Sequence, residues 1–229
     1  MENGFFKTPV GANYVEYVTP AITTGTLRPV LPALAEGVNP NQRVGAQIAP
    51  KVIKIRGTLC FANEYAEGFA ADVRIMVCTN KQQRYMPDLL ADAGGQYSNT
   101  LLWDGSTGNP AQYKGAQPYY NLLPINNKGW KSIHDQVVHL RNSNGTVPSP
   151  TTQAFLGTQY SKDFEIVLTS ADLPAQLKYD GGLGVAFPTN FAPVLCMGWT
   201  YPDTAITIGD PAYQKVITVQ YTVSMIYED

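Results

Sequence analysis

Apolar and polar residues alternate over long stretches of this chain, with the period of two that indicates β-strands. The clearest case spans residues 51–61 (KVIKIRGTLCF), where Lys54 and Arg56 fall on one face. The opposite face carries the apolar side chains of Ile53, Ile55, Leu59 and Phe61. Gly57 also lies on the apolar face, where we expect a bend or a close approach of another part of the chain.

The same alternation, or a short apolar run between turn residues, predicts further strands. They cover residues 72–79, 130–140, 162–169, 184–187, 194–200 and 215–227, and an early strand, broken by prolines, fits between residues 14 and 34. One helix is predicted at residues 84–93. The rest of the connection over about residues 80–129 is irregular and far longer than usual, so we expect it to fold against something or to serve a function.

Helices of 10–15 residues do not alternate with these strands, so a parallel βαβ architecture is not expected. The 17 prolines and 20 glycines are spread along the chain, which argues against long helices and against one detachable linker. The pattern therefore predicts an all-β sandwich with elaborate loops, in one domain over residues 1–229.

Charged residues are scarce in this sequence. They make up 15% of the 229 residues, against roughly 25% in an ordinary soluble domain. Such a composition fits a surface that partners cover, and equally a surface of uncharged polar side chains. The formal net charge of −2 argues against a generally basic nucleic-acid binder. No apolar run approaches the ~18 residues of a membrane helix, so no membrane partner is expected.

Groupings typical of enzymes and metal sites do not stand out. The only histidines, His134 and His139, have a spacing that puts them on opposite faces of a strand. The three cysteines form no Cys-x-x-Cys pair and are expected to be small buried side chains. Asp163 and Glu165 share a strand face, where a solvated surface is a better explanation than a glycosidase pair. We therefore expect no enzyme, no cofactor and no metal.

Aromatic residues gather in the long connection. They could stack on sugars, as in a carbohydrate-binding sandwich, or act as packing anchors between subunits. The candidates for subunit contacts are Trp103, Tyr119, Tyr120 and Trp130.

One segment carries a more specific pattern. Residues 41–59, NQRVGAQIAPKVIKIRGTL, resemble the capsid proteins of small circular single-stranded DNA viruses that encode a replication initiator, the circovirus-like group. The positions that match are Asn41, Arg43, Gly45, Ile48, Lys51, Ile53, Ile55 and Gly57. The resemblance implies an eight-stranded antiparallel jelly-roll sandwich with long inter-strand loops and at most one or two short helices. In that family, this segment leads from the first strand into the second.

The resemblance also implies a function. Capsid proteins of this kind assemble in the host cell into the closed icosahedral shell of the virion, here expected to hold roughly 60 copies. The shell would enclose a single-stranded genome, expected to be DNA, although small RNA virus shells share the architecture. A carbohydrate-binding, lectin-like β-sandwich stays the alternative.

Several cations are candidates for contacts within such a shell. Lys51, Lys54, Arg56 and Arg74 are candidate nucleic-acid contacts, with a merely solvated strand face as the competing explanation for Lys54 and Arg56. Arg43 is expected to pair with a carboxylate or carbonyl of an adjacent subunit. The family's Arg/Lys-rich N-terminal arm has no counterpart in residues 1–42, whose only cations are Lys7 and Arg28. An acidic subunit neutralises few phosphates, so genome contacts are expected to be few.

Overall fold

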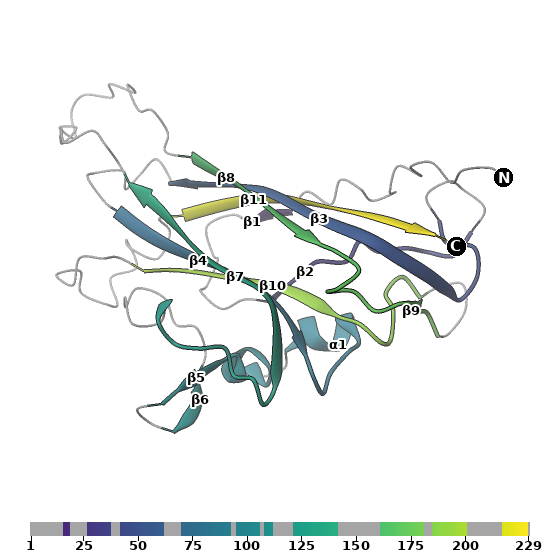
Figure 1. Cartoon of the computed structure of the whole chain (residues 1–229), viewed down its shortest axis with the longest axis horizontal. Coiled ribbons are helices and arrows are strands. Elements are labelled where there is room, and N and C mark those ends of the chain that lie inside the picture. The colour runs from purple at the N-terminus through teal and green to yellow at the C-terminus, as the bar shows by residue number, and fades with distance from the viewer. Residues whose placement is uncertain are drawn as a thin grey trace.

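The computed structural model describes residues 16–18, 27–37, 42–61, 70–92, 95–105, 108–111, 121–141, 161–180, 185–200 and 217–228. Over these residues the chain forms two antiparallel sheets that lie face to face, with one short α-helix to one side (Figure 1). The predicted all-β sandwich is therefore confirmed. No helix in this described part of the chain is long and apolar enough to cross a membrane.

Each sheet is built on four strands. The first has the order β1-β11-β3-β8, with bounds Glu16–Val18, Ile217–Glu228, Gln47–Phe61 and Ser161–Leu168. A two-residue strand, β9 (Leu177–Lys178), pairs with the beginning of β3. The second sheet has the order β2-β10-β4-β7, with bounds Leu27–Pro29, Pro193–Thr200, Ala70–Asn80 and Trp130–Arg141.

The pairing of these eight strands is nested along the chain. β1 pairs with β11, β2 with β10, β3 with β8 and β4 with β7, all antiparallel, so the first strand meets the last and the second meets the last but one. The pairs β3–β11 and β4–β10 then join these partners into the two sheets. This strand order is that of a jelly roll.

Two details of the predicted strands are wrong. The segment 14–34 contains two short strands in different sheets, so β3 is the third of the eight strands and not the second. Residues 185–187 form no strand, because their carbonyls are used elsewhere: Val185 O accepts from the Arg43 side chain and Ala186 O from the Leu34 amide. Gly184, the first residue of that predicted strand, lies outside the described residues.

The core fills the space between the two sheets. On β3, Ile53, Ile55 and Leu59 have no exposed surface, whereas Arg56 on the alternate face is exposed, as the alternation predicts. The close approach expected at Gly57 is also confirmed. A Cβ added to this glycine would lie 2.5 Å from Cζ of Phe164 and 2.6 Å from the carbonyl oxygen of Gln220.

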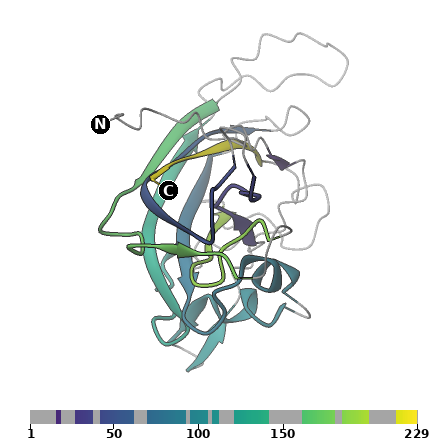
Figure 2. The ribbon, with the colours of Figure 1, turned by 90° about the vertical axis from the view of Figure 1, so that its right-hand side faces the viewer.

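The long connection between β4 and β7 lies against the second sheet (Figures 1 and 2), where its Asn121 and Leu123 form hydrogen bonds with residues of β4 and β10. It contains α1 (Met86–Ala91), a 3-10 turn (Ser98–Thr100) and a hairpin of β5 (Leu102–Asp104) and β6 (Asn109–Ala111). Strand β10 is consequently buried along its whole length. The expectation that this connection folds against the domain is confirmed. Its helix is shorter than predicted, since Asp92 has a left-handed φ of 36°.

Candidate subunit-contact and nucleic-acid-binding surfaces

The turn that leads into β3 is the part of the chain with the family-like pattern. Two backbone hydrogen bonds close it: the Arg43 amide donates to Ala35 O and the Gly37 amide donates to Arg43 O, both at 3.1 Å. Gly45 has a φ of 94°, a left-handed conformation that favours glycine. The order Arg-Val-Gly therefore suits this backbone, with glycine where the chain must turn.

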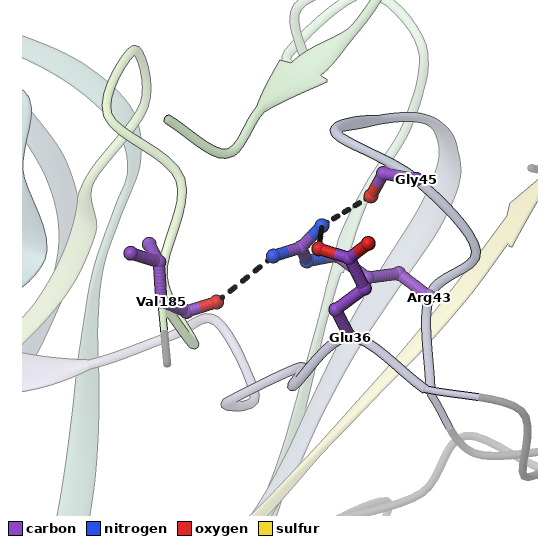
Figure 3. Close-up of polar contacts among 4 residues, drawn as sticks. All are labelled: Glu36, Arg43, Gly45 and Val185. Atoms are coloured by element: carbon purple, nitrogen blue, oxygen red, sulfur yellow. Dashed lines mark hydrogen bonds and ion pairs between the residues drawn. The ribbon is translucent and has the colours of Figure 1, made fainter. Parts of the chain in front are cut away.

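The side chain of Arg43 points into the molecule (Figure 3). Its guanidinium donates from Nη1 to Glu36 Oε2 at 3.2 Å and to the carbonyl of Gly45, and from Nη2 to the carbonyl of Val185 at 3.2 Å. The same group lies 4.5 Å from the ring centroid of Tyr179. Arg43 thus joins the β2–β3 turn to the segment between β9 and β10.

The subunit-contact prediction for Arg43 is corrected by this geometry. The residue has no exposed surface, and the carboxylate and carbonyls that it binds belong to its own chain. Burial of an arginine is costly unless its charge is paired and hydrogen-bonded. Here Glu36 and two carbonyls accept from Nη1 and Nη2, whereas the buried Nε has no hydrogen-bond partner among the described residues. Such partners can come from the same chain or from a neighbour, and the local pattern does not distinguish the two cases.

The turn presents Val44 instead. This residue lies between Arg43 and Gly45 and is 64% exposed, the second most exposed large apolar side chain among those described. Because Arg43 anchors the turn on both sides, Val44 is held in place at the surface. Its exposure is not predicted by the sequence pattern, since a single valine in a polar turn carries no periodic signal.

The outer face of the first sheet holds three of the predicted nucleic-acid contacts. Lys51 pairs with Glu228 on β11 at 2.8 Å, and Arg56 pairs with Glu165 on β8. Both pairs are exposed, as is the hydrogen bond of 2.6 Å from Thr58 to Asp163. Lys54 lies between Ser224 and Val167 in the ladder and is half-buried.

These three cations are matched by three carboxylates on the adjoining strands, Asp163, Glu165 and Glu228, so together they carry no formal net charge. A phosphate approaching this face meets as many negative as positive groups. The arrangement is that of a solvated, ion-paired strand face, the competing explanation for Lys54 and Arg56, and their nucleic-acid role stays a prediction.

The prediction for Arg74 is wrong. Its side chain is buried on the outer face of the second sheet and forms a bidentate pair with Asp135, at 2.8 Å from Nε and 2.6 Å from Nη2. Nη1 donates to the carbonyl of Leu123, in the connection that covers this face, at 2.6 Å. Because Arg74 lies beneath this connection, it does not reach an external ligand.

The aromatic candidates lie in different surroundings. Trp130 is 1% exposed and its Nε1 donates to Thr100 Oγ1 at 3.2 Å, so it is a core residue and not a subunit contact. Trp103 is partly exposed, with Lys128 Nζ 4.9 Å from its ring centroid. Its predicted contact role is untested. Tyr119 and Tyr120 lie outside the described residues.

A further basic site, absent from the predictions, lies where β4 ends and β7 begins. Here Lys81, Arg84 and Lys131 surround a hollow of about 300 Å³, which we call the cationic cleft. The other described residues that line it include one acid, Asp172, whose carboxylate accepts from the Thr169 amide at 3.0 Å. Lys131 lies about 50 residues after Lys81 and Arg84 in the sequence, so the grouping of all three depends on the β4–β7 pairing.

Comparison with known proteins adds no relative: no protein-family model and no curated protein matches this chain in sequence. Function is therefore inferred from the fold and from the surfaces described above.

Proposed function

We propose that this protein is a viral capsid protein, which self-assembles into a small icosahedral shell around a single-stranded nucleic-acid genome. The observation that carries this proposal is the nested pairing of eight strands into a jelly roll. Capsid proteins are one of the major groups built on this fold. The capsid-like pattern over residues 41–59 points the same way, because Gly45 and Arg43 in it have defined structural roles.

The surfaces of the domain support self-association. In the second sheet, β10 is buried along its length, whereas the outer face of the first sheet carries the partly exposed apolar residues Val52, Val167 and Ile226 beside balanced charges. A neutral, partly apolar sheet face suits contact with another copy, because little net charge has to be desolvated. In a closed shell such contacts end in a particle of fixed size rather than in an open fibre.

The test is direct observation of assembly. The purified protein, examined by negative-stain electron microscopy and sedimentation velocity over a range of salt and pH, should give closed particles of uniform size. Nuclease treatment of particles from the expression host should leave protected nucleic acid inside. Only monomers under all of these conditions would contradict the proposal.

The lectin-like alternative rests on the same fold, which also occurs in lectin domains. In its favour, the partly exposed Trp103 borders a hollow of about 310 Å³, where a sugar ring could stack. This alternative predicts a monomer that retains defined glycans on an array. A capsid protein gives particles regardless of glycan, so the two measurements together separate the candidates.

A further inference from the structure

The cations of the cationic cleft differ in their surroundings from Lys51 and Arg56 on the first sheet. Lys51 and Arg56 each have a carboxylate within ion-pair distance. Lys81, Arg84 and Lys131 have none in the part of the chain that the structure describes. Cations that surround one hollow repel each other, so an anion bound between them is stabilised by all of them.

The backbone that carries these cations is well held. Lys131 belongs to the β4–β7 ladder, opposite Thr79, and Lys81 follows the last residue of β4. The Lys81 amide donates to Gly129 O at 2.8 Å, which ties this turn to the start of β7. Asn80, the residue before Lys81, accepts with its side-chain Oδ1 from the backbone amides of Gln82 and Gln83 at 2.8 and 2.9 Å. The positions of Lys81 and Lys131 relative to each other are therefore set before any ligand arrives.

An aromatic side chain lies next to this cluster. Lys81 Nζ donates to the carbonyl of Asn127, and Asn127 lines the adjoining hollow together with Trp103 and Lys128. Lys128 adds a fourth cation, close to the Trp103 ring. Proteins that bind single-stranded nucleic acid combine a positively charged groove, which contacts the phosphate backbone, with aromatic side chains, on which the bases stack.

We propose that the cationic cleft binds backbone phosphates of single-stranded nucleic acid and that Trp103 stacks on a neighbouring base. This inference deepens the proposed capsid function, on which it rests for the identity of the ligand. It assigns the genome contact to the place where β4 ends and β7 begins, and not to the charge-balanced face of the first sheet. Three cations contact only a few phosphates, which agrees with a chain whose formal net charge is −2.

The experiment uses unassembled subunits of the full chain and a fluorescein-labelled oligothymidylate, with fluorescence anisotropy measured against salt concentration. Three phosphate contacts predict a slope of about −2 in a plot of log K against log salt, since each contact on a single strand contributes roughly 0.7. The double variant Lys81→Glu/Lys131→Glu should bind about tenfold or more weakly, with a slope nearer −0.7.

The matched control is Lys51→Glu/Lys54→Glu, which makes the same change of net charge on the first sheet. It should weaken binding by less than about threefold, because those cations lie among carboxylates. The milder double variant Lys81→Gln/Lys131→Gln removes the two charges without reversing them and should still weaken binding. In the single variant Trp103→Phe, most of the tryptophan quenching by the oligonucleotide should disappear, since the other two tryptophans, Trp130 and Trp199, are buried.

Several results would overturn the inference. Equal weakening by the two Lys→Glu double variants would mean that only the net charge matters. Displacement of the oligonucleotide by equimolar pyrophosphate would assign the cleft to a free phosphate ligand. Unchanged binding with lost assembly in Lys81→Glu/Lys131→Glu would make the cleft a contact between copies.

The outcomes for this cleft and for the capsid proposal are separable. Binding is measured on unassembled subunits, so a chain that binds through the cleft but never forms particles contradicts the capsid function alone. Particles that form from a subunit with no measurable affinity for the oligonucleotide contradict the cleft assignment alone.

Discussion

At the scale of single residues, Arg43 is the most informative side chain of this protein. It is a fully buried cation, and burial of a charge is tolerated only with paired and hydrogen-bonded surroundings. Its partners come from positions 36, 45 and 185, so one side chain holds together two connections that lie far apart in the sequence. Arg43 is therefore a stabilising residue of the fold itself.

Replacement of Arg43 by alanine should lower the free energy of unfolding by about 2–4 kcal/mol, because Glu36 and two carbonyls lose their donor and a cavity remains. Urea denaturation measures this. The control is Arg56→Ala, which removes an exposed ion pair and should cost less than about 1 kcal/mol. If the two variants are equally stable, the structural role of Arg43 is wrong.

At the scale of elements, the contact of β3 with its two neighbours depends on one residue without a side chain. Gly57 lies on the inward face between Phe164 on β8 and Tyr221 on β11, in register with both. The ring of Phe164 occupies the space that a side chain at position 57 would need. The packing of three adjacent strands of the first sheet, β11, β3 and β8, thus depends on this glycine.

We expect Gly57→Ala to destabilise the protein by about 1–3 kcal/mol, because the added methyl group overlaps both a ring and a backbone carbonyl. Thermal unfolding followed by circular dichroism measures the change. Gly105→Ala is the control, since a Cβ there meets nothing within 4 Å. A Phe164→Leu change should rescue Gly57→Ala only in part, because the Gln220 carbonyl stays in place.

At the scale of the whole molecule, three buried acidic groups link stability to alkaline pH. Burial raises the pKa of the Cys196 thiol to about 12, and it raises the pKa values of the Cys78 thiol and the Tyr179 phenol as well. Cys78 on β4 and Cys196 on β10 lie in the second sheet, and Tyr179 directly follows β9, which pairs with β3 of the first sheet. The expectation that the cysteines are small buried side chains is confirmed for Cys78 and Cys196.

Groups with a raised pKa in the folded state contribute their full stabilisation below the pKa of the unfolded chain, about 8.5 for a thiol. Above that value the unfolded chain ionises first, so the free energy of unfolding should fall by about 1.4 kcal/mol per pH unit for each thiol. Urea midpoints at pH 7, 8.5 and 10 measure this decline. A Cys78→Ala/Cys196→Ala variant should lose stability less steeply with pH; an unchanged slope would contradict the account.

Much of the fold was predictable because alternation is a property of neighbouring residues. The strands β3, β4, β7, β8, β10 and β11 were each expected near their observed positions, and the inward direction of Ile53, Ile55 and Leu59 on β3 was expected as well. The short strands β1 and β2 were merged into one, since three residues are too few to show a period. The candidate surfaces were predicted less well, because exposure depends on what covers a strand.

The sequence by itself determined where the strands lie, which β3 side chains point inward, and that the domain is an all-β sandwich. Only the tertiary structure decided which groups the arginine side chains bind. Arg56 meets Glu165 across 109 residues, Arg74 meets Asp135 across 61, and Arg43 reaches Val185 across 142. A side chain's face follows from its immediate neighbours, whereas its partner depends on the register of strands that are distant along the chain.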